Sequence, residues 1–198
     1  MSVFEHWNQR YLDGNTPWDS GLVSKELIRV VKESQIAPCR ALELGCGTGT
    51  NAVWLAEQGF AVTAVDCSEH AIDAARRKAE ASGVDVDFLC EDVCELALSG
   101  KPFPFVFDRG CYHCARRDNR EGILQVLQRV TGADSTYLVL TGNANEVRDH
   151  GPPGLFEDDV RNELGELFDV EFIRAFHFED PGGIRGPLGW SCLLRRST

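Results

Sequence analysis

Short apolar stretches that alternate with helical patterns constrain the fold of this chain most. Helical patterns begin at Ser24 and recur over residues 51–58, 69–81, 119–130 and 157–167. The apolar stretches predicted as strands are 40–44, 61–65, 86–89, 103–107, 136–140, 170–178 and 190–194. This alternation predicts βαβ units and a mostly parallel sheet. No helical pattern separates the last two strands, so we expect them to form an antiparallel pair at the end of the sheet.

Composition narrows the class of protein. The chain has 198 residues, of which 43% are hydrophobic, and a formal net charge of −11. We therefore expect one globular domain over residues 1–198, acting as a monomer or homodimer. The acidic balance argues against partners that are nucleic acids or anionic membranes, because their phosphates attract Lys and Arg. The absence of a long apolar stretch or a signal sequence, together with eight cysteines, favours a cytoplasmic protein with reduced thiols.

A glycine-rich segment directly after the first predicted strand is the strongest functional signal. Residues 43–49 read Glu-Leu-Gly-Cys-Gly-Thr-Gly and precede a predicted helix. Glycines in such a strand–turn–helix context let the backbone approach a ligand closely. A dinucleotide fingerprint would place glycine at position 50, where Thr50 stands, and a phosphate-binding P-loop would end in Gly-Lys-Ser/Thr. The spacing therefore predicts a small-ligand site of another kind.

Acidic residues follow the next two predicted strands. Asp66 ends the strand 61–65 and is placed to bind ribose hydroxyls, or else to cap the following helix. Glu91, Asp92 and Val93 follow the strand 86–89, where a carboxylate can accept a hydrogen bond from an adenine amino group or simply stabilise a turn. Because the carboxyl ends of parallel strands meet at one edge of an open sheet, these groups converge on one ligand.

Taken together, the segments 43–49, 65–68 (Val-Asp-Cys-Ser) and 90–93 (Cys-Glu-Asp-Val) resemble class I S-adenosylmethionine-dependent methyltransferases. The resemblance implies a Rossmann-like, doubly wound, seven-stranded sheet in three layers, mostly parallel, with an antiparallel last strand. It also implies S-adenosylmethionine as cofactor and S-adenosylhomocysteine as product. The implied cofactor-binding residues in the body of the chain are Glu43, Gly45, Cys46, Gly47, Thr48, Gly49, Asn51, Asp66, Cys67, Ser68, Glu91, Asp92, Val93, Asp108 and Arg109.

The N-terminal segment 1–23 carries a narrower resemblance. Trp7 and the run Thr16–Gly21 are similar to a segment of thiopurine and thiol (halide/thiocyanate) methyltransferases that folds over the cofactor. The resemblance implies that Trp7 and Trp18 bind the cofactor, and an aromatic face suits a sulfonium cation. The alternative is simple docking of this segment on the core. Residues 149–153 resemble the plant thiol and halide enzymes, but Gly154 replaces their tyrosine, so the resemblance reaches the group and not one member.

The segment after the fourth predicted strand is the candidate acceptor site. Tyr112 and His113 are candidates to position or deprotonate a methyl acceptor. Cys111 and Cys114 resemble half of a zinc site, but no second half completes it, so we expect no metal and interpret them as buried or reactive thiols. Candidate contacts to the acceptor are Trp18, Arg109, His150 and Arg185. Arg116, Arg117 and Arg120 begin a helix and are either solvated or attract an anionic acceptor.

These observations predict methyl transfer to a small-molecule acceptor, most simply a thiol or other soft nucleophile. The alternatives are N- or O-methylation of a small metabolite, a nicotinamide- or flavin-dependent oxidoreductase on the same scaffold, and a binding module without turnover. Methylation of nucleic acids is disfavoured, because the Asn/Asp-Pro-Pro-aromatic motif of such enzymes is replaced by Asp108-Arg-Gly-Cys.

Overall fold

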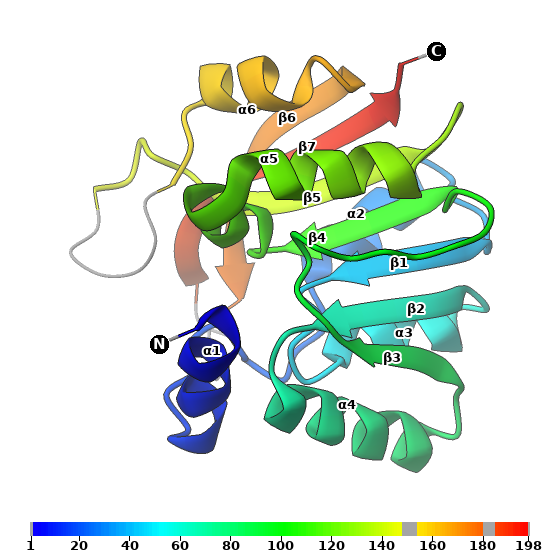
Figure 1. Cartoon of the computed structure of the whole chain (residues 1–198). Helices are drawn as coiled ribbons and strands as arrows, with labels where there is room; N and C mark the ends of the chain where they lie inside the picture. Colours follow the sequence, from blue (N-terminus) through cyan, green and yellow to red (C-terminus); the bar gives the residue numbers. More distant parts are fainter. Residues whose placement is uncertain (1, 148–153, 180–184, 198) are drawn as a thin grey trace.

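A computed structural model describes residues 2–147, 154–179 and 185–197 of the chain. The strands are β1 (Arg40–Leu44), β2 (Ala61–Asp66), β3 (Val86–Cys90), β4 (Phe105–Arg109), β5 (Thr136–Gly142), β6 (Phe168–Glu179) and β7 (Arg185–Arg196). The helices are α1 (Val3–Leu12), α2 (Lys25–Glu33), α3 (Thr50–Glu57), α4 (Glu69–Ser82), α5 (Tyr112–Val130) and α6 (Glu157–Leu164). Figure 1 shows α1 beyond the carboxyl ends of β1, β2 and β4, which the arrowheads mark.

The described strands form one sheet in the order β3-β2-β1-β4-β5-β7-β6. β1 to β5 pair in parallel, whereas β7 runs antiparallel to both β5 and β6. The strand order reverses between β1 and β4, so the chain leaves an open crevice at the carboxyl ends of these strands. This arrangement confirms the predicted Rossmann-like fold with an antiparallel last strand.

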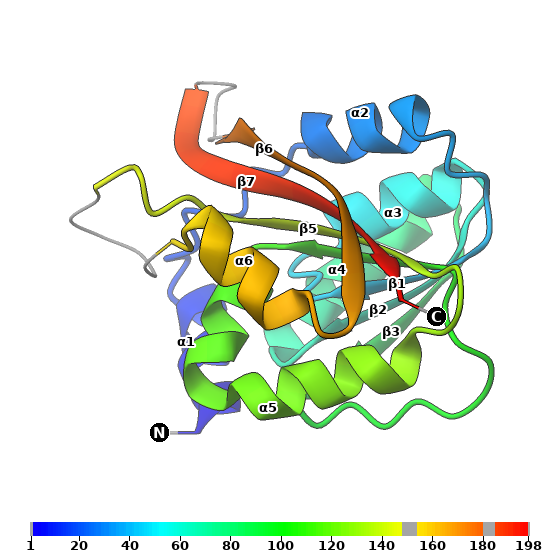
Figure 2. The same ribbon diagram turned by 90° about the horizontal axis from the view of Figure 1, so that it is seen from above.

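Helices cover both faces of the sheet and give the three layers (Figure 2). One apolar cluster joins residues of α2, α3 and α4 to one face, and a second joins α5 and α6 to the other. β1 contributes to both clusters, with Leu42 and Leu44 in one and Ala41 in the other, because a strand presents side chains to both faces of a sheet. A loop over residues 91–104, all of them described, joins β3 to β4 in place of a helix.

The N-terminal segment contains a helix that the sequence analysis did not predict. Ser2 caps α1 through a capping box with Glu5, which satisfies backbone N–H groups that a helix start leaves unpaired. No residue of α1 is buried. The apolar periodicity that reveals core helices is therefore weak here.

Other boundaries differ from the predictions, most clearly those of β4, α5 and β7. β4 begins after Pro104, which has no N–H for the sheet, and not at Phe103. α5 begins at Tyr112, seven residues before the predicted start, and its backbone leaves helical geometry at Asn119, where the prediction began it. β7 begins at Arg185 and extends beyond the predicted 190–194. Gly83, in contrast, ends α4 in the left-handed conformation that glycine favours, close to the predicted boundary.

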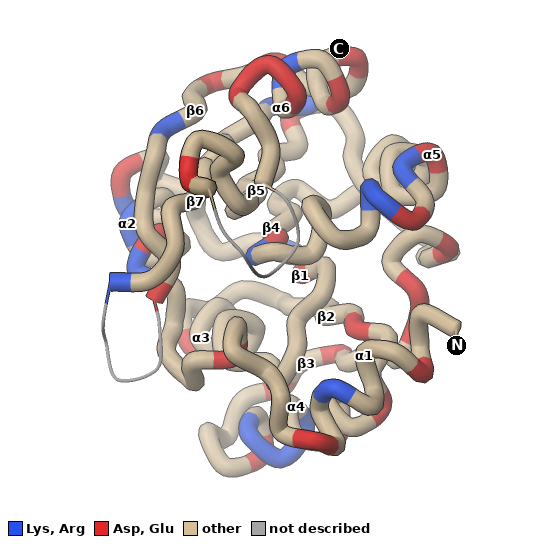
Figure 3. The backbone as a smooth tube through the Cα atoms, turned by 90° about the vertical axis from the view of Figure 1, so that its left-hand side faces the viewer, with Lys and Arg blue, Asp and Glu red and all other residues tan. Residues whose placement is uncertain are grey.

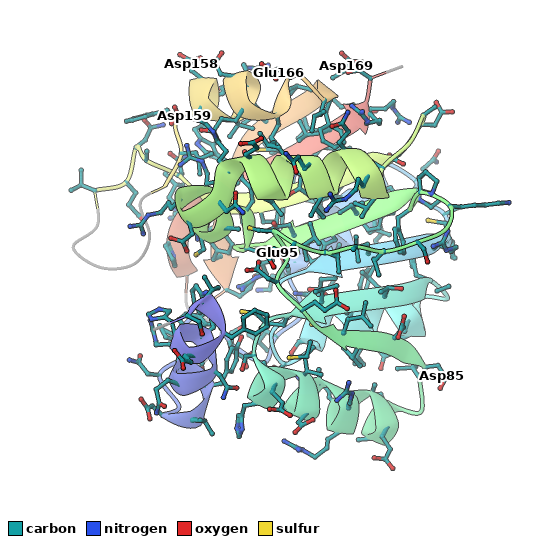
Figure 4. All side chains as sticks on the ribbon, viewed as in Figure 1. Asp85, Glu95, Asp158, Asp159, Glu166 and Asp169 are labelled. Carbon is teal, nitrogen blue, oxygen red and sulfur yellow. The ribbon has the colours of Figure 1, made fainter. Side chains whose placement is uncertain are left out.

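The distribution of charge matches the acidic composition. Lys and Arg positions alternate with Asp and Glu along the elements seen in Figure 3. Four labelled acids, Asp158, Asp159, Glu166 and Asp169, lie around α6 and the start of β6, away from α1 (Figure 4). Among the residues that the structure describes, no helix is both long and apolar enough to cross a membrane.

Candidate active site

A cavity of about 760 Å³ lies at the carboxyl ends of the parallel strands. Its walls come from α1 and the segment after it, the loops that follow β1 to β4, and the ends of β5 and β6. Fourteen of the predicted site residues line it: Trp7, Trp18, Glu43, Gly45, Cys46, Gly47, Thr48, Asn51, Asp66, Cys67, Asp92, Val93, Arg109 and His113. The residues singled out by the strand–turn–helix argument therefore surround one cavity.

The glycine loop that follows β1 passes between two neighbouring segments. Gly45 and Gly47 both have positive φ, of 66° and 53°, which glycine adopts without strain. A methyl group on Gly45 would lie 2.5 Å from Cβ of Cys111, and one on Gly47 would lie 2.8 Å from the Tyr11 hydroxyl. Both positions thus need glycine for close approach as well as for backbone conformation.

Glu43, the last residue but one of β1, is buried beside this loop. Among the described residues its Oε2 atom has no hydrogen-bond partner. Burial raises the pKa of this carboxyl to about 8, although a hydrogen bond from Asn51 opposes the shift. A buried carboxylate oxygen that faces a cavity without a partner is suited to a ligand ammonium group.

Asp66 ends β2 on the opposite side of the glycine loop. Its Oδ2 accepts a hydrogen bond from the Gly47 N–H at 2.8 Å, and its Oδ1 accepts one from the Ser68 N–H at 2.9 Å. Burial raises its pKa, while these backbone N–H groups lower it. Each oxygen keeps a second lone pair, so the carboxylate can also accept hydrogen bonds from a vicinal diol.

The N-terminal segment closes the cavity above the glycine loop. Trp18 donates a hydrogen bond from Nε1 to the Tyr11 hydroxyl at 3.2 Å, and the Trp7 and Trp18 rings meet edge to face at 5.3 Å. Asn8 accepts hydrogen bonds through Oδ1 from the start of α4, at Ser68 Oγ and the His70 N–H, each at 3.0 Å. We call residues 2–23 the lid, since polar contacts and aromatic rings hold them over the cavity.

A second set of contacts fixes the lid at the other end of the cavity. The Arg109 guanidinium donates to the Trp18 carbonyl at 3.0 Å and lies 3.7 Å from a carboxylate oxygen of Glu179. It also lies over the Phe178 ring, 5.1 Å from its centroid. Arg109 therefore joins the end of β4 to both the lid and the end of β6.

His113 lines the cavity from the first turn of α5. Its Nδ1 accepts a hydrogen bond from the Gly142 N–H at 3.0 Å. A ring nitrogen that accepts carries no proton, so the neutral imidazole is protonated on Nε2. Protonating Nδ1 would place two N–H groups against each other, which disfavours His113 as the base for an acceptor.

The structure corrects the interpretation of Tyr112. This side chain is fully buried in the apolar cluster beneath α5, and its hydroxyl donates to Glu163 on α6 at 2.9 Å. Burial is the main cause that raises its pKa, and the Glu163 carboxylate adds to it. Tyr112 does not line the cavity, so it neither positions nor deprotonates an acceptor there.

Asp108 is also turned away from the cavity. Its two carboxylate oxygens accept hydrogen bonds from the N–H groups of Cys111 and Tyr112, each at 2.8 Å. Burial raises its pKa to about 7, against the effect of these bonds. Asp108 therefore holds the start of α5 in place and does not contact a ligand in the cavity.

Other predicted contacts also lie outside the cavity lining. Ser68 caps α4, Gly49 packs against Ala75, and Glu91 is exposed. Arg185 is exposed and contacts His177, whereas His150 lies outside the described residues.

The arginines at the start of α5 do not attract an anion into the site. Arg116 pairs with Glu163, and Arg117 and Arg120 are exposed. The interpretation of these residues as a solvated and ion-paired helix start is therefore preferred to an anion-attracting role.

Sequence reasoning missed several lining residues. In the N-terminal segment Tyr11 also lines the cavity, at the glycine loop, and Phe178 and Glu179 line it from the last residue of the predicted strand 170–178 and the residue after it. Thr50, considered above only as a departure from the dinucleotide fingerprint, lines the cavity too, and Lys78 on α4 donates to its hydroxyl at 2.6 Å. Only the position of Thr50 directly after the glycine loop was a usable signal.

Cysteines also line the cavity, at positions 46, 67, 94, 111 and 114. All eight cysteines of the chain lie in the described part and are free thiols. Burial raises the pKa of Cys111 and Cys114, which keeps both thiols protonated. In the described ranges, no group of three or more His, Cys, Asp or Glu side chains is placed to hold a metal ion.

Comparison with known proteins agrees with this geometry. Residues 41–134 match the family described as "Methyltransferase domain". A Schizosaccharomyces pombe methyltransferase is 32% identical over 98 residues, which cover 50% of this chain and 68% of that protein. The chain belongs to the S-adenosylmethionine-dependent methyltransferase family.

Further relatives place the methyltransferase within a broad group. A putative methyltransferase of Geobacillus is 37% identical over 95 residues. The matched region is 47% of this chain and only 37% of the length of that protein. The 2-heptyl-1-hydroxyquinolin-4(1H)-one methyltransferase of Mycobacteroides abscessus is 25% identical over 82% of this chain and 72% of that protein.

A solved structure shows the same fold over nearly the whole chain. It comes from work on conversion of a disulfide bond into a thioacetal group during echinomycin biosynthesis. The two superpose with a TM-score of 0.84 at 24% identity and cover 98% of this chain and 93% of that one. This similarity supports the fold of the methyltransferase.

The residues present fit S-adenosylmethionine. Glu43 lines the cavity with one carboxylate oxygen that has no hydrogen-bond partner among the described residues, which suits the ammonium group, and Asp66 has lone pairs for the ribose hydroxyls. The acidic groups and the Trp rings of the cavity suit a sulfonium cation. Bound there, this cofactor supplies a methyl group that its positive sulfur has already activated for transfer.

Proposed function

We propose that this methyltransferase transfers the methyl group of S-adenosylmethionine to a small-molecule acceptor through a sulfur or another soft nucleophile. The state of His113 carries this proposal. Its Nδ1 is occupied by the Gly142 N–H, and Tyr112 lies outside the cavity, so neither predicted base is placed to accept a proton. A thiol with a pKa of about 8.5 is partly ionised near neutral pH and needs little help from a base.

The contribution of the protein to such a reaction is binding, alignment and exclusion of water. Glu43 and Asp66 hold the two polar ends of the cofactor, and the lid covers them through Trp7 and Trp18. Arg109 draws the lid onto the acceptor end of the cavity through the Trp18 carbonyl. Fixing two reactants in line in a closed site accounts for a large part of the rate enhancement that such reactions need.

The lid also supports roles for its two tryptophans in cofactor binding. The pair of tryptophans ahead of α2 is what the resemblance to the thiol methyltransferase group implied, and both rings line the cavity. We accordingly propose that Trp7 and Trp18 cover the cofactor. The acidic balance of the chain supports a free small molecule as acceptor in preference to a nucleic acid.

Methylation of nitrogen or oxygen is a second candidate, and one observation favours it. Within the described part of the chain, Oε2 of Glu179 is buried without a hydrogen-bond partner, and Glu179 is one of the residues that line the cavity. A carboxylate in this position can accept the proton that an amine or hydroxyl releases.

Calorimetric binding of S-adenosylhomocysteine, with NADH as control, tests the cofactor first. We expect binding of S-adenosylhomocysteine alone; binding of NADH would revive the oxidoreductase alternative. Thiols, amines and phenols are then offered as acceptors, and the released S-adenosylhomocysteine is measured. Binding without product from any acceptor would favour a binding module.

The pH profile of His113→Ala separates the two acceptor classes. For a sulfur acceptor we expect little loss of kcat above the thiol pKa, because the nucleophile ionises by itself. A loss of several orders of magnitude at high pH would contradict the proposal.

A further inference from the structure

Two buried charged groups at the acceptor end of the cavity each keep one polar atom without a partner. Within the described residues these atoms are Nε of Arg109 and Oε2 of Glu179. Their side chains are only 11% and 7% exposed, and both line the cavity. Buried polar atoms in folded proteins nearly always have partners, so such a pair at a ligand cavity calls for a ligand.

The unused atoms are held apart by bonds that the same side chains make elsewhere. The Arg109 guanidinium donates to the Trp18 carbonyl at 3.0 Å, and Oε1 of Glu179 accepts from the Lys25 N–H at 2.9 Å. The two side chains approach no closer than 3.7 Å, outside hydrogen-bond distance. The donor Nε of Arg109 and the acceptor Oε2 of Glu179 therefore lie near each other, and each side chain is held by a hydrogen bond to another segment of the chain.

The position of the pair points to the acceptor and not to the cofactor. Glu43, Asp66 and Asp92 lie at the carboxyl ends of β1, β2 and β3, which occupy one half of the sheet. Arg109 ends β4, and Glu179 ends β6 at the opposite edge. The residues proposed to hold the cofactor thus lie on one side of the strand-order reversal, and Arg109 and Glu179 lie on the other side.

We propose that Arg109 and Glu179 recognise a neutral, planar acceptor through an edge that presents a ring N–H beside a carbonyl oxygen, as in a cyclic amide. The carbonyl would accept from Arg109 Nε, and the ring N–H would donate to Glu179 Oε2. This inference rests on the proposed function, because it names the acceptor class for the same cavity. In this proposal the N–H and carbonyl edge of the acceptor is bound by Arg109 and Glu179, and the atom that receives the methyl group is a different atom of the acceptor.

Charge and shape both favour this class. Arg109 and Glu179 together carry no net charge, and the rest of the cavity lining has more acidic than basic side chains, so a simple inorganic anion gains little there. The Phe178 ring, over which the Arg109 guanidinium lies at 5.1 Å, adds an apolar wall beside the pair. A planar ring with a polar edge satisfies both features.

Two isomers test the recognition of the edge directly. 2-Pyridone has its N–H beside the carbonyl, whereas 4-pyridone has the same atoms with the two groups at opposite ends of the ring. Each is titrated by NMR into the full-length protein saturated with S-adenosylhomocysteine, and thiocyanate serves as the anionic comparison. Because hydrogen bonds to charged groups are involved, we expect 2-pyridone to bind about ten- to a hundredfold tighter than 4-pyridone.

Glu179→Gln supplies the matched variant. The amide oxygen still accepts from the Lys25 N–H, but an NH₂ group replaces the free acceptor, so the preference for 2-pyridone should fall to about twofold or less. Thiocyanate should bind more tightly, because the Arg109 charge is no longer compensated. Glu171→Gln on the same strand removes an equal charge outside the cavity and should leave the preference unchanged.

Several outcomes would overturn the inference. These are equal binding of the two isomers, binding of neither, tighter binding of thiocyanate to the wild type, and a loss of S-adenosylhomocysteine affinity in Glu179→Gln. Arg109→Lys, which keeps the charge but moves the donor, repeats the test if Glu179→Gln does not fold. Because the readout is binding, a failure to methylate any acceptor would refute the proposed function and leave this inference standing.

Discussion

Alanine at Gly47 should weaken cofactor binding through the lid and not through the loop itself. The substitution has two consequences. A residue with a side chain in the left-handed conformation, at a φ of 53°, costs about 1–2 kcal/mol. In addition, the new methyl group would lie 2.8 Å from the Tyr11 hydroxyl, whereas the next ring atom, Cζ of Tyr11, is 3.9 Å away.

The second consequence sets the magnitude of the binding effect. Tyr11 must move, so its hydroxyl loses the hydrogen bond that Trp18 donates at 3.2 Å. Such a bond contributes about 1 kcal/mol, which corresponds to about a fivefold increase in the Kd for S-adenosylhomocysteine. Loss of the aromatic contacts that follow Trp18 extends this to about tenfold.

A double-mutant cycle with Tyr11→Phe separates the two consequences. Phenylalanine removes the hydroxyl that the new methyl group would meet, so Gly47→Ala should add no further increase in Kd in that background. Gly83→Ala is the matched control for strain: it has a φ of 68°, and its added methyl group has no neighbour within 4 Å. Both glycine variants should lower Tm by about 2–8 °C, with only Gly47→Ala affecting calorimetric binding.

An equal increase in Kd with and without the Tyr11 hydroxyl would refute this reasoning. It would show that the backbone of the glycine loop, and not the lid, carries the effect.

Three further outcomes follow from contacts already described. Burial raises the folded-state pKa of Glu43 to about 8 and of Asp108 to about 7, so the protonated carboxyls stabilise the folded protein most at low pH. The Tm of the ligand-free protein should therefore fall as the pH rises from about 5 to 8, and Glu43→Gln should reduce this fall. Asn8→Ala should speed proteolysis of the lid about tenfold with little change in Tm, because it removes two hydrogen bonds to α4; an unchanged cleavage rate would contradict this tether. Tyr112→Phe should destabilise the fold by about 1–3 kcal/mol in denaturant titrations yet leave kcat intact, whereas a kcat loss at full stability would restore Tyr112 as a reacting group.

The sequence was sufficient for the parts of the site that the backbone itself builds. Gly45 and Gly47 lie where a loop must pass close to its neighbours, and Asp66 lies where a parallel strand ends. Short-range spacing fixes both features, and the strand alternation fixes where they meet. The fold followed from this reasoning, and so did the meeting of the glycine loop and Asp66 at one cavity.

The acceptor half depended on contacts that spacing does not encode. Asp108 lies near the end of β4 and Tyr112 shortly after it, where ligand-binding residues often stand, but Asp108 caps α5 and Tyr112 points into the core. Which side of the start of α5 faces the cavity depends on tertiary packing, here of Tyr112 against α6. Glu179 lies one residue beyond the predicted strand 170–178, and the direction of its side chain depends on the pairing of β6 with β7, which spacing does not encode.

The dual attachment of Trp18 has a kinetic consequence. Its indole N–H binds Tyr11 above the glycine loop, while its carbonyl binds Arg109 at the acceptor end. One residue therefore spans both compartments, and lifting the lid opens them together. Opening of the lid should then release both products, and this step rather than chemistry should set the steady-state rate.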